Sequence, residues 1–473
     1  MSSTRGFAPV PAKPLSANRW PAALAGFASV AAGLGAAELV ATVLAPAASP
    51  FVVVGSFVID LSPGWLKEFV IGVFGTADKL VLLICVGLLV AVLAAIAGVL
   101  EQLHPPMGRL LILVVGATGI AIAATRANAT WTWALPSATA LVVGVIVLRI
   151  MIRRLAGRFA EGDARGLAAQ DRRSFLIFAG AMTLAGIVAA VAGRVATRAI
   201  QSVDAARRMF TLPPPAVAAA AVSQGAALNV PGIAPLVTAN SDFYRIDTAI
   251  LVPAVDPATW SLKIYGLVEK EVTLSFDELL ALELEENYTT LACVSNSVGG
   301  DLIGNALWLG YPIRKLLAQA NPGSAADMVL SRSIDGFTAG TPLSALTDDR
   351  NAILAVGMNG EPLPAEHGFP VRMVVPGLYG YVSATKWVTE LKVTRFADDV
   401  GYWTPLGWSA RGPVKLSSRI DTPRGGKSIG AGSTVIAGVA WSQHVGVSRV
   451  QVRVDDGAWK DATLADAISI DTW

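Results

Sequence analysis

The most informative part of the sequence is the stretch Tyr288-Thr-Thr-Leu-Ala-Cys-Val-Ser-Asn-Ser-Val-Gly-Gly-Asp-Leu-Ile-Gly-Asn-Ala-Leu-Trp308. It places Cys293 at the end of a short run with strand character and follows it with glycines at 299, 300 and 304. Glycine lets the backbone approach a bulky group closely, so we expect this cysteine to lie beside something large. The only other cysteine, Cys85, lies in an apolar run, which excludes a disulfide framework.

Outward from this stretch, the chain divides into two halves of different composition. Long apolar segments dominate residues 20–193, and an ordinary mixed composition follows from about residue 230. The 53% hydrophobic and 15% charged content therefore averages a membrane part and a globular part. The net charge of +2 does not indicate nucleic-acid binding, because the basic residues concentrate in one loop.

Five apolar segments approach the length of about 20 residues that crosses a hydrocarbon core. They are Pro21–Leu44, Leu80–Leu100, Leu110–Thr125, Trp133–Ile152 and Ser174–Gly193. Hydrophobic segments continue after the first one, which argues against a cleaved signal peptide. We therefore expect a multi-pass protein of the cell membrane, in contact with membrane lipid.

The arginines predict the orientation of these segments. The connection between the fourth and fifth segments holds Arg149, Arg153, Arg154, Arg158, Arg165, Arg172 and Arg173 against only three acidic residues. The positive-inside rule places this connection in the cytoplasm. With five spans, the N-terminal residues 1–19 are then cytoplasmic too, and everything after the fifth span, Cys293 included, is extracytoplasmic.

A second signal bears on export. The stretch Asp171-Arg-Arg-Ser-Phe-Leu-Ile177 resembles a twin-arginine export motif that stands before an apolar segment. The alternative is that two arginines merely flank a helix on its cytoplasmic side. We favour export because Phe175 and Leu176 stand in the register of the motif.

The second half predicts a tether and then a mixed globular part. Residues 194–237, which include Leu212-Pro-Pro-Pro215, are expected to form a Pro/Ala-rich tether. Alternation and periodicity in the domain that follows, 238–424, predict a strand at Trp260–Gly266 and helices at Ser275–Leu284 and Pro312–Ala320. In residues 425–473, strands are expected at Ser433–Trp441, Val447–Val454 and Ala458–Leu464.

Six motifs stand in a fixed order along this half. They are Ser241-Asp-Phe-Tyr-Arg-Ile-Asp247, Asp256-Pro-Ala-Thr-Trp260, Thr290-Leu-Ala-Cys293, Gly304-Asn-Ala-Leu-Trp-Leu-Gly310, His367-Gly-Phe-Pro-Val-Arg372 and Ser383-Ala-Thr-Lys-Trp387. The ordered set resembles the molybdopterin domain of the sulfite oxidase family, over residues 238 to 473. The resemblance implies the following fold class: about five membrane helices, an α+β molybdopterin domain, and a partial immunoglobulin-like β domain.

The resemblance also implies a mononuclear molybdenum that is bound by a pterin dithiolene and by Cys293, which would be metal ligand and catalytic residue. A soft, deprotonated sulfur suits such a metal. Without the motif, a buried and inert cysteine would be the default interpretation. The matching positions imply that the pterin, its phosphate or the border of the metal pocket is contacted by Tyr244, Arg245, His367, Arg372, Ser383 and Lys386.

The roles of three residues, Arg245, Asn240 and Thr338, are less closely defined by the resemblance. Arg245 is also a candidate for a catalytic role facing the substrate oxyanion, by its match to the family's arginine near the metal. Asn240 and Thr338 are candidates for cofactor binding only because they stand near matching motifs. Taken singly, any of these residues would be interpreted as a surface ion pair or a turn residue.

Two departures from the family bear on the substrate. The cysteine motif of sulfite oxidases continues into Asn-Arg-Arg, whereas here Asn296 is followed by Ser297 and Val298. The pocket thus lacks positive charge where sulfite would need it. The family's Asp-Tyr-Lys-Gly-Phe segment appears as Asp399-Val-Gly-Tyr-Trp403, so the catalytic tyrosine is Tyr402 or is missing. We expect oxygen-atom transfer on a small substrate other than sulfite.

The sequence also limits how electrons are exchanged. The membrane half offers only His104 as an axial haem ligand, and there is neither a Cys-x-x-Cys-His motif nor enough cysteine for an iron–sulfur cluster. We expect no haem or iron–sulfur cluster in this chain. A separate partner, such as a quinone-linked protein or a cytochrome, is then needed to exchange electrons.

Two questions stay open at this stage. An immunoglobulin-like module takes about 100 residues, so residues 425–473 are either a shortened module or part of an incomplete sequence, and the family's homodimer is left undecided. The alternative function is a non-catalytic membrane binding or sensory protein that retains the fold. The retained Cys293, His367, Arg372 and Lys386 argue against it.

Overall fold

The structure is a computed structural model that describes residues 19–74, 77–127, 129–160, 167–200, 203, 206–207 and 210–473. The chain forms two compact units. The first consists of Met1–Gly55, Leu82–Thr125 and Ala129–Arg198, and the second of Ser56–Val81, Arg126–Asn128 and Ala199–Trp473. Most of the predicted cytoplasmic N-terminus, residues 1–18, lies outside the described residues.

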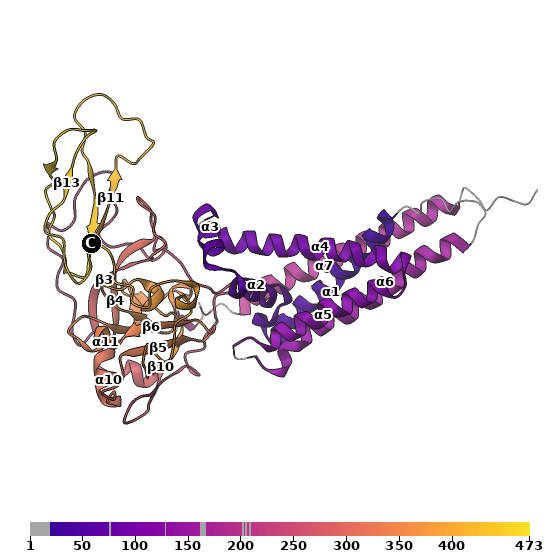
Figure 1. Cartoon of the computed structure of the whole chain (residues 1–473), viewed down its shortest axis with the longest axis horizontal. Helices are drawn as coiled ribbons and strands as arrows, with labels where there is room; N and C mark the ends of the chain where they lie inside the picture. Colours follow the sequence, from indigo (N-terminus) through magenta and orange to yellow (C-terminus); the bar gives the residue numbers. More distant parts are fainter. Residues whose placement is uncertain are drawn as a thin grey trace, which may run out of the picture. The chain divides into compact units, whose positions relative to one another are not determined.

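Five long helices dominate the first unit. They are α1 (Trp20–Leu44), α4 (Asp78–Leu103), α5 (Met107–Ala124), α6 (Ala134–Ala160) and α7 (Leu167–Ile200) (Figure 1). All five contain stretches that are long and apolar enough to cross a membrane. The five segments predicted from the sequence are therefore confirmed as apolar helices, and α7 continues past the predicted end at Gly193.

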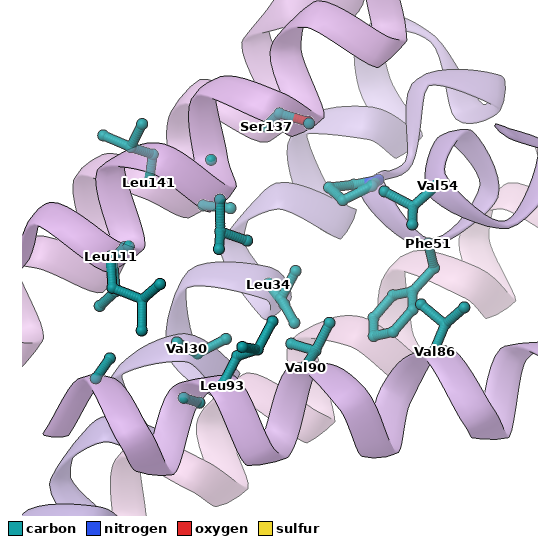
Figure 2. A pocket seen from close by; sticks show the side chains of 18 residues that line it. Val30, Leu34, Phe51, Val54, Val86, Val90, Leu93, Leu111, Ser137 and Leu141 are labelled. Atoms are coloured by element: carbon teal, nitrogen blue, oxygen red, sulfur yellow. The ribbon is translucent and has the colours of Figure 1, made fainter. Parts of the chain in front are cut away.

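Small residues allow α1 to pack closely against its neighbours. A Cβ atom on Gly26 would lie 2.7 Å from the backbone nitrogen of Gly98 in α4, and one on Gly33 would lie 2.5 Å from the Ala140 carbonyl oxygen in α6. Close backbone approach through small residues is a common way for apolar helices to associate. An apolar cavity of about 120 Å³ remains between α1, α4, α5, α6 and the short helix α2 (Pro50–Leu61), with Ser137 as the polar side chain on its wall (Figure 2).

Two short helices lie between α1 and α4 and were not predicted. They are α2 (Pro50–Leu61) and α3 (Gly64–Phe74), and two 3₁₀ turns, η1 (Pro46–Ala48) and η3 (Trp131–Trp133), complete the helical half. At 12 and 11 residues, α2 and α3 are too short to cross a membrane. Their apolar stretches were therefore too short to be predicted as membrane spans from the sequence.

Two five-stranded sheets build the core of the second unit (Figure 1). The first has the order β2-β1-β10-β5-β6, and the second joins β3-β4-β7-β8 with β9 paired to β7. In sequence order the strands are β1 (Ser261–Gly266), β2 (Val272–Ser275), β3 (Glu285–Ala292), β4 (Ile303–Pro312), β5 (Met328–Ser333), β6 (Thr338–Pro342), β7 (Ile353–Met358), β8 (Glu361–Pro362), β9 (Arg372–Val374) and β10 (Val388–Thr394).

Short helices cover these sheets. They are α9 (Phe276–Leu280), α10 (Ile313–Ala320) and α11 (Ser344–Thr347). A capping box between Ser275 and Glu278 starts α9. The prediction of a helix to Leu284 was wrong at its end, because the carbonyl of Leu284 accepts a hydrogen bond from Ala216 N at 2.8 Å and the chain enters β3.

The predicted tether is ordered against the second unit from residue 210 onward. Phe210 and Leu212 pack on its hydrophobic core, and Val217 forms a parallel bridge with Glu285. The carbonyl of Leu236 accepts a hydrogen bond from Asn305 Nδ2 at 2.9 Å. These contacts fix the described part of the segment along the domain, while the predicted domain boundaries themselves stay predictions.

Residues 417–473 contain two separate hairpins. They pair β11 (Ser417–Thr422) with β12 (Ala437–Trp441), and β13 (Gln451–Val452) with β14 (Lys460–Asp461). The predicted strands are present but shorter than expected. The side-chain nitrogen of Trp473 donates to the Leu236 carbonyl at 3.0 Å, and its backbone N–H donates to Thr290 Oγ1 at 3.0 Å. Trp473 thus holds the C-terminal segment against the end of β3 that precedes Cys293.

Candidate functional site

Cys293 follows the last residue of β3, and the loop after it returns to β4. Its backbone N–H donates to the Leu302 carbonyl at 2.9 Å, and its carbonyl accepts from Asn296 N at 3.1 Å. The side chain of Asn296 accepts from Leu302 N at 3.0 Å and closes the loop internally. Two paired strands and these three bonds fix the backbone at Cys293, a residue of intermediate exposure.

The glycine at position 300 is required by this loop. A Cβ atom there would lie 2.6 Å from Asn296 Oδ1 and 2.9 Å from the Ser297 carbonyl oxygen. The carbonyl of Gly300 also accepts a hydrogen bond at 2.7 Å from Arg419, whose guanidinium is paired with Asp421 at 2.6 Å. The cysteine loop is therefore held by the Asn296 side chain within it and by Arg419 from another part of the chain.

The thiol of Cys293 is not activated by its own surroundings. Burial raises its pKa, and hydrogen bonds from Ser295 act in the opposite direction without cancelling that effect. A thiolate at this position therefore needs an additional positive partner, as a bound metal would provide.

Tyr244 connects the cysteine to a group of cations. Burial and the charge of Cys293 both raise the pKa of the Tyr244 phenol, whereas Arg372 lowers it, so the phenol interacts electrostatically with both residues. Its ring stacks on Phe243 with centroids 5.2 Å apart. Arg372, in β9, is 5% exposed and lies over the Trp308 ring at 5.1 Å.

Arg372 and His367 are coupled through the backbone. Arg372 Nη1 donates to the His367 carbonyl at 3.1 Å, and His367 Nε2 lies 3.2 Å from the carbonyl of Asn240. Burial first, and then the charges of Arg372, Lys386 and Arg245, lower the pKa of His367 to about 3. His367 is therefore neutral at physiological pH, and because the Asn240 carbonyl can only accept, the ring proton is on Nε2.

Asp247 lies at the centre of the cations. Its Oδ2 accepts from Lys386 Nζ at 2.6 Å and from Arg245 Nε at 2.9 Å, and its Oδ1 pairs with Lys79 Nζ at 2.5 Å. Burial would raise the pKa of this carboxyl, but the three cations together hold it well below the ordinary range. Burial lowers the pKa of Lys386 to about 8, which leaves the lysine mostly charged at pH 7.

These side chains leave an excess of positive charge. Arg245, Lys386 and Lys79 share the carboxylate of Asp247, and Arg372 makes no ion pair with a carboxylate in the described part of the chain. Three positive charges are thus uncompensated in a largely buried site. Buried charges are normally paired, so these cations leave room for a further anionic partner beside Asp247.

Other residues predicted for the site have local partners. Ser383 is fully buried and donates to the Tyr379 carbonyl at 3.0 Å. The side chain of Asn240 donates to the Met358 carbonyl at 3.2 Å and accepts from Asn359 at 2.8 Å. Both therefore support loops of the site, and Asn240 reaches it through its own carbonyl.

Thr338 and Tyr402 form a different contact. The Thr338 carbonyl accepts from Tyr402 N at 3.0 Å, and the Tyr402 hydroxyl accepts from Lys67 Nζ at 2.9 Å. Among the described residues, no hydrogen bond, ion pair or ring contact joins either of them to Cys293. Their assignment to the site stays a prediction without support from these contacts.

Two residues of the site were missed in the sequence. Asp247 ends a quoted motif two positions after Arg245, and this spacing could have indicated a carboxylate that orients the arginine. Lys79 had no such signal, because it is 168 residues from Asp247 in the chain.

Comparison with known proteins identifies the second unit. A family described as "Oxidoreductase molybdopterin binding domain" matches residues 249–403. The uncharacterized oxidoreductase YuiH of Bacillus subtilis is 33% identical over 157 residues, which are 33% of this chain and 76% of YuiH. The chain belongs to the molybdopterin oxidoreductases of the sulfite oxidase type.

Other relatives of this molybdopterin oxidoreductase are longer. Mitochondrial sulfite oxidase of Homo sapiens is 30% identical over 256 residues, which are 45% of this chain and 47% of the human protein. The chain thus spans about half the length of the sulfite oxidases it matches. The sulfane dehydrogenase SoxCD of Paracoccus pantotrophus superposes with a TM-score of 0.40 at 26% identity, over 46% of this chain and 62% of that one.

The predicted sulfite-oxidase-type domain is confirmed by these matches, and so is the prediction of an enzyme rather than a non-catalytic relic. The individual site residues remain predictions, supported by the geometry described above.

Proposed function

We propose that this molybdopterin oxidoreductase holds molybdenum–molybdopterin, with Cys293 Sγ as the protein ligand, and performs oxygen-atom transfer on a small substrate other than sulfite. The observation that carries the proposal is the buried cluster of uncompensated cations, which Tyr244 connects to Cys293. When bound, the cofactor supplies a metal centre that accepts or donates two electrons as an oxygen atom is transferred.

The residues present suit that group at both ends. Cys293 offers a soft sulfur that is protonated in its own surroundings and becomes a thiolate when a metal binds. Arg245, Lys386 and Arg372 offer charge-assisted hydrogen bonds to a terminal phosphate. Neutral His367 adds no charge, and its Nε2–H donates to the Asn240 carbonyl. We therefore assign it to positioning Arg372, the first residue of β9, whose Nη1 donates to the His367 carbonyl.

The substrate side of the site differs from that of a sulfite oxidase. Val298, which stands where sulfite oxidases have an arginine, is fully exposed at the tip of the cysteine loop. Arg245 is the most exposed of the paired cations, with 36% of its side chain accessible. Arg245 is already paired with Asp247, so its remaining N–H groups suit a substrate oxygen that is neutral or weakly charged better than a dianionic substrate.

We further propose that the five apolar helices cross the cell membrane and that the catalytic unit is extracytoplasmic. Five spans would place residues 56–81, residues 126–128 and everything after α7 on one side, and these three segments belong to one compact unit. Arg126 and Asp60, from two of these segments, pair at 2.6 Å. The arginine-rich connection after the fourth span would be cytoplasmic, which leaves the other side for the catalytic unit.

Electrons are then exchanged with a separate partner, a quinone-linked protein or a cytochrome. The proposal rests on the small number of haem and cluster ligands in the sequence, where the membrane half has only His104. Twin-arginine export, which moves folded proteins, would suit a unit that receives its cofactor in the cytoplasm; of the motif, the side chains of Asp171 and Arg172 lie outside the described residues.

The test compares the two cysteines of the full-length protein. Wild type, Cys293→Ser and Cys85→Ser are purified in detergent from a host that makes the cofactor, and molybdenum and extracted pterin are measured. We expect near-stoichiometric molybdenum and pterin in wild type and in Cys85→Ser, since Cys85 is exposed on α4, and loss of molybdenum and turnover in Cys293→Ser. Absence of both from the wild type, or normal molybdenum and turnover in Cys293→Ser, would refute the proposal.

A further inference from the structure

One member of the cation cluster around Asp247, Lys79, lies outside the predicted molybdopterin domain, residues 238–424. Lys79, in the first turn of α4, pairs through Nζ with Asp247 Oδ1 at 2.5 Å, on the oxygen that Lys386 and Arg245 leave open. The matched family domain begins at residue 249, and Lys79 precedes it by 170 positions. The segment Ser56–Val81, which ends in the first turn of α4, therefore reaches the cations around Asp247.

The position of Lys79 is not explained by Asp247 alone. Lys386 and Arg245 already provide two positive charges for one carboxylate, and only 5% of the Asp247 side chain is exposed. Adding a third cation brings like charges together in a poorly solvated place, which is unfavourable unless another anion is bound. A dianionic phosphate beside Asp247 would balance these charges.

A second, independent contact holds the same segment on the catalytic unit. Lys67 of α3 donates to the Tyr402 hydroxyl at 2.9 Å and lies over the rings of Tyr402 and Trp403 at 4.8 and 5.2 Å. Gly64 lies so near Leu406 that a Cβ atom would be 2.9 Å from its carbonyl oxygen. Lys67 and Gly64 therefore hold this segment against residues 402–406 without any contribution from Lys79. The ion pair between Lys79 and Asp247 is not needed to hold the segment in place.

We propose that Lys79 is a cofactor-binding residue that completes the site for the terminal phosphate of the pterin. The pocket is then built from two distant parts of the chain, and retention of the cofactor depends on the segment Ser56–Val81. This inference rests on the proposed function, because it assumes that the phosphate-bearing cofactor is the ligand of the cluster.

The experiment measures how fast the pterin is lost. Full-length protein is purified with its cofactor, dialysed for increasing times, and assayed for retained pterin by fluorescence after oxidation and for molybdenum by elemental analysis. Lys79→Met removes the charge, Lys79→Arg keeps it, and Lys67→Met is the matched control, since it breaks the other lysine contact of the same segment.

We expect Lys79→Met to lose pterin about tenfold faster than wild type, which corresponds to one lost charge-assisted hydrogen bond. Lys79→Arg and Lys67→Met should retain it within about threefold of wild type. Thermal unfolding shows whether each variant is folded, and Lys79→Gln repeats the neutral substitution if Lys79→Met is not.

Equal retention in wild type and the neutral Lys79 variants would overturn the inference, and so would equally fast loss in Lys67→Met, which would assign Lys79 to attachment of the segment. If wild type itself carries no pterin, the proposed function fails, and that result is distinct from failure of the role of Lys79.

Discussion

Arg372 Nη1 donates to the backbone carbonyl of His367 at 3.1 Å, so a buried guanidinium lies beside an imidazole whose pKa is lowered to about 3. A histidine with a lowered pKa binds fewer protons in the folded state than in the unfolded state. The free energy of unfolding therefore falls as the pH drops below the ordinary histidine value of about 6.5.

The first prediction follows from this sign. At pH 5 the contribution of His367 should lower the free energy of unfolding of the wild type by about 2 kcal/mol relative to pH 7. His367→Asn, which can still donate to the Asn240 carbonyl, should lose about 2 kcal/mol less over the same range. Denaturant unfolding at both pH values, followed by tryptophan fluorescence, measures the difference. An identical pH dependence in the two proteins would contradict the assignment of a neutral buried His367.

The second prediction concerns Lys386, whose pKa burial lowers to about 8. Its charge helps to bind an anion below pH 8 and is lost above it. Binding of sulfate, a dianion that does not titrate in this range, to cofactor-free protein should weaken above pH 8 by up to about tenfold per pH unit. Titration calorimetry between pH 7 and 9 tests this.

Lys386→Arg is the control for this effect, because a guanidinium stays charged throughout the range. Its sulfate affinity should change by less than about threefold between pH 7 and 9. A steep loss in the arginine variant as well would show that another group controls anion binding.

The third prediction concerns the cysteine loop. Gly300→Ala places a Cβ atom 2.6 Å from Asn296 Oδ1, so the bond from Leu302 N to Asn296 has to break or the loop has to move. Gly425→Ala is the matched control, because nothing lies within 4 Å of a Cβ atom there.

We expect Gly300→Ala to lower the free energy of unfolding by about 1–3 kcal/mol and to reduce the molybdenum content of the purified protein. Gly425→Ala should leave both within error of wild type. Full molybdenum content and unchanged stability in Gly300→Ala would show that the internal bond of the loop does not position Cys293.

Much of this architecture could be predicted from local patterns. The long apolar helices and the motif order needed only composition and spacing, and α10 begins and ends within one residue of its predicted bounds because its apolar face is periodic. The short helices α2 and α3 could not be predicted in this way, because they are shorter than a span and their packing partners, such as Tyr402 for Lys67, are more than 300 residues away.

The candidate site shows the same division. Arg245, His367, Arg372 and Lys386 stand in motifs, and the structure brings them together around Asp247. Lys79 could not be found from the sequence, because one lysine before an apolar helix is an ordinary flanking residue. Thr338 was placed by proximity to motifs, but its strand, β6, belongs to the β2-β1-β10-β5-β6 sheet, whereas Cys293 follows β3 of the other sheet.

The last prediction tests the side of the membrane on which the site lies. Alkaline phosphatase, which is active only outside the cytoplasm, should be active when fused after residue 240 and inactive when fused in the connection at residue 163. The count of five spans and the arginines of that connection give this expectation. Activity at residue 163 and none after residue 240 would reverse the topology.

Replacing both Arg172 and Arg173 by lysine separates the two explanations of that arginine pair. Lysine keeps the positive charge that orients a helix, but it does not preserve a twin-arginine signal. If the pair is an export signal, phosphatase fused after residue 240 should lose most of its activity in the double variant. If the pair only marks the cytoplasmic end of the apolar part of α7, activity should be unchanged, and the extracytoplasmic position would then rest on charge distribution alone.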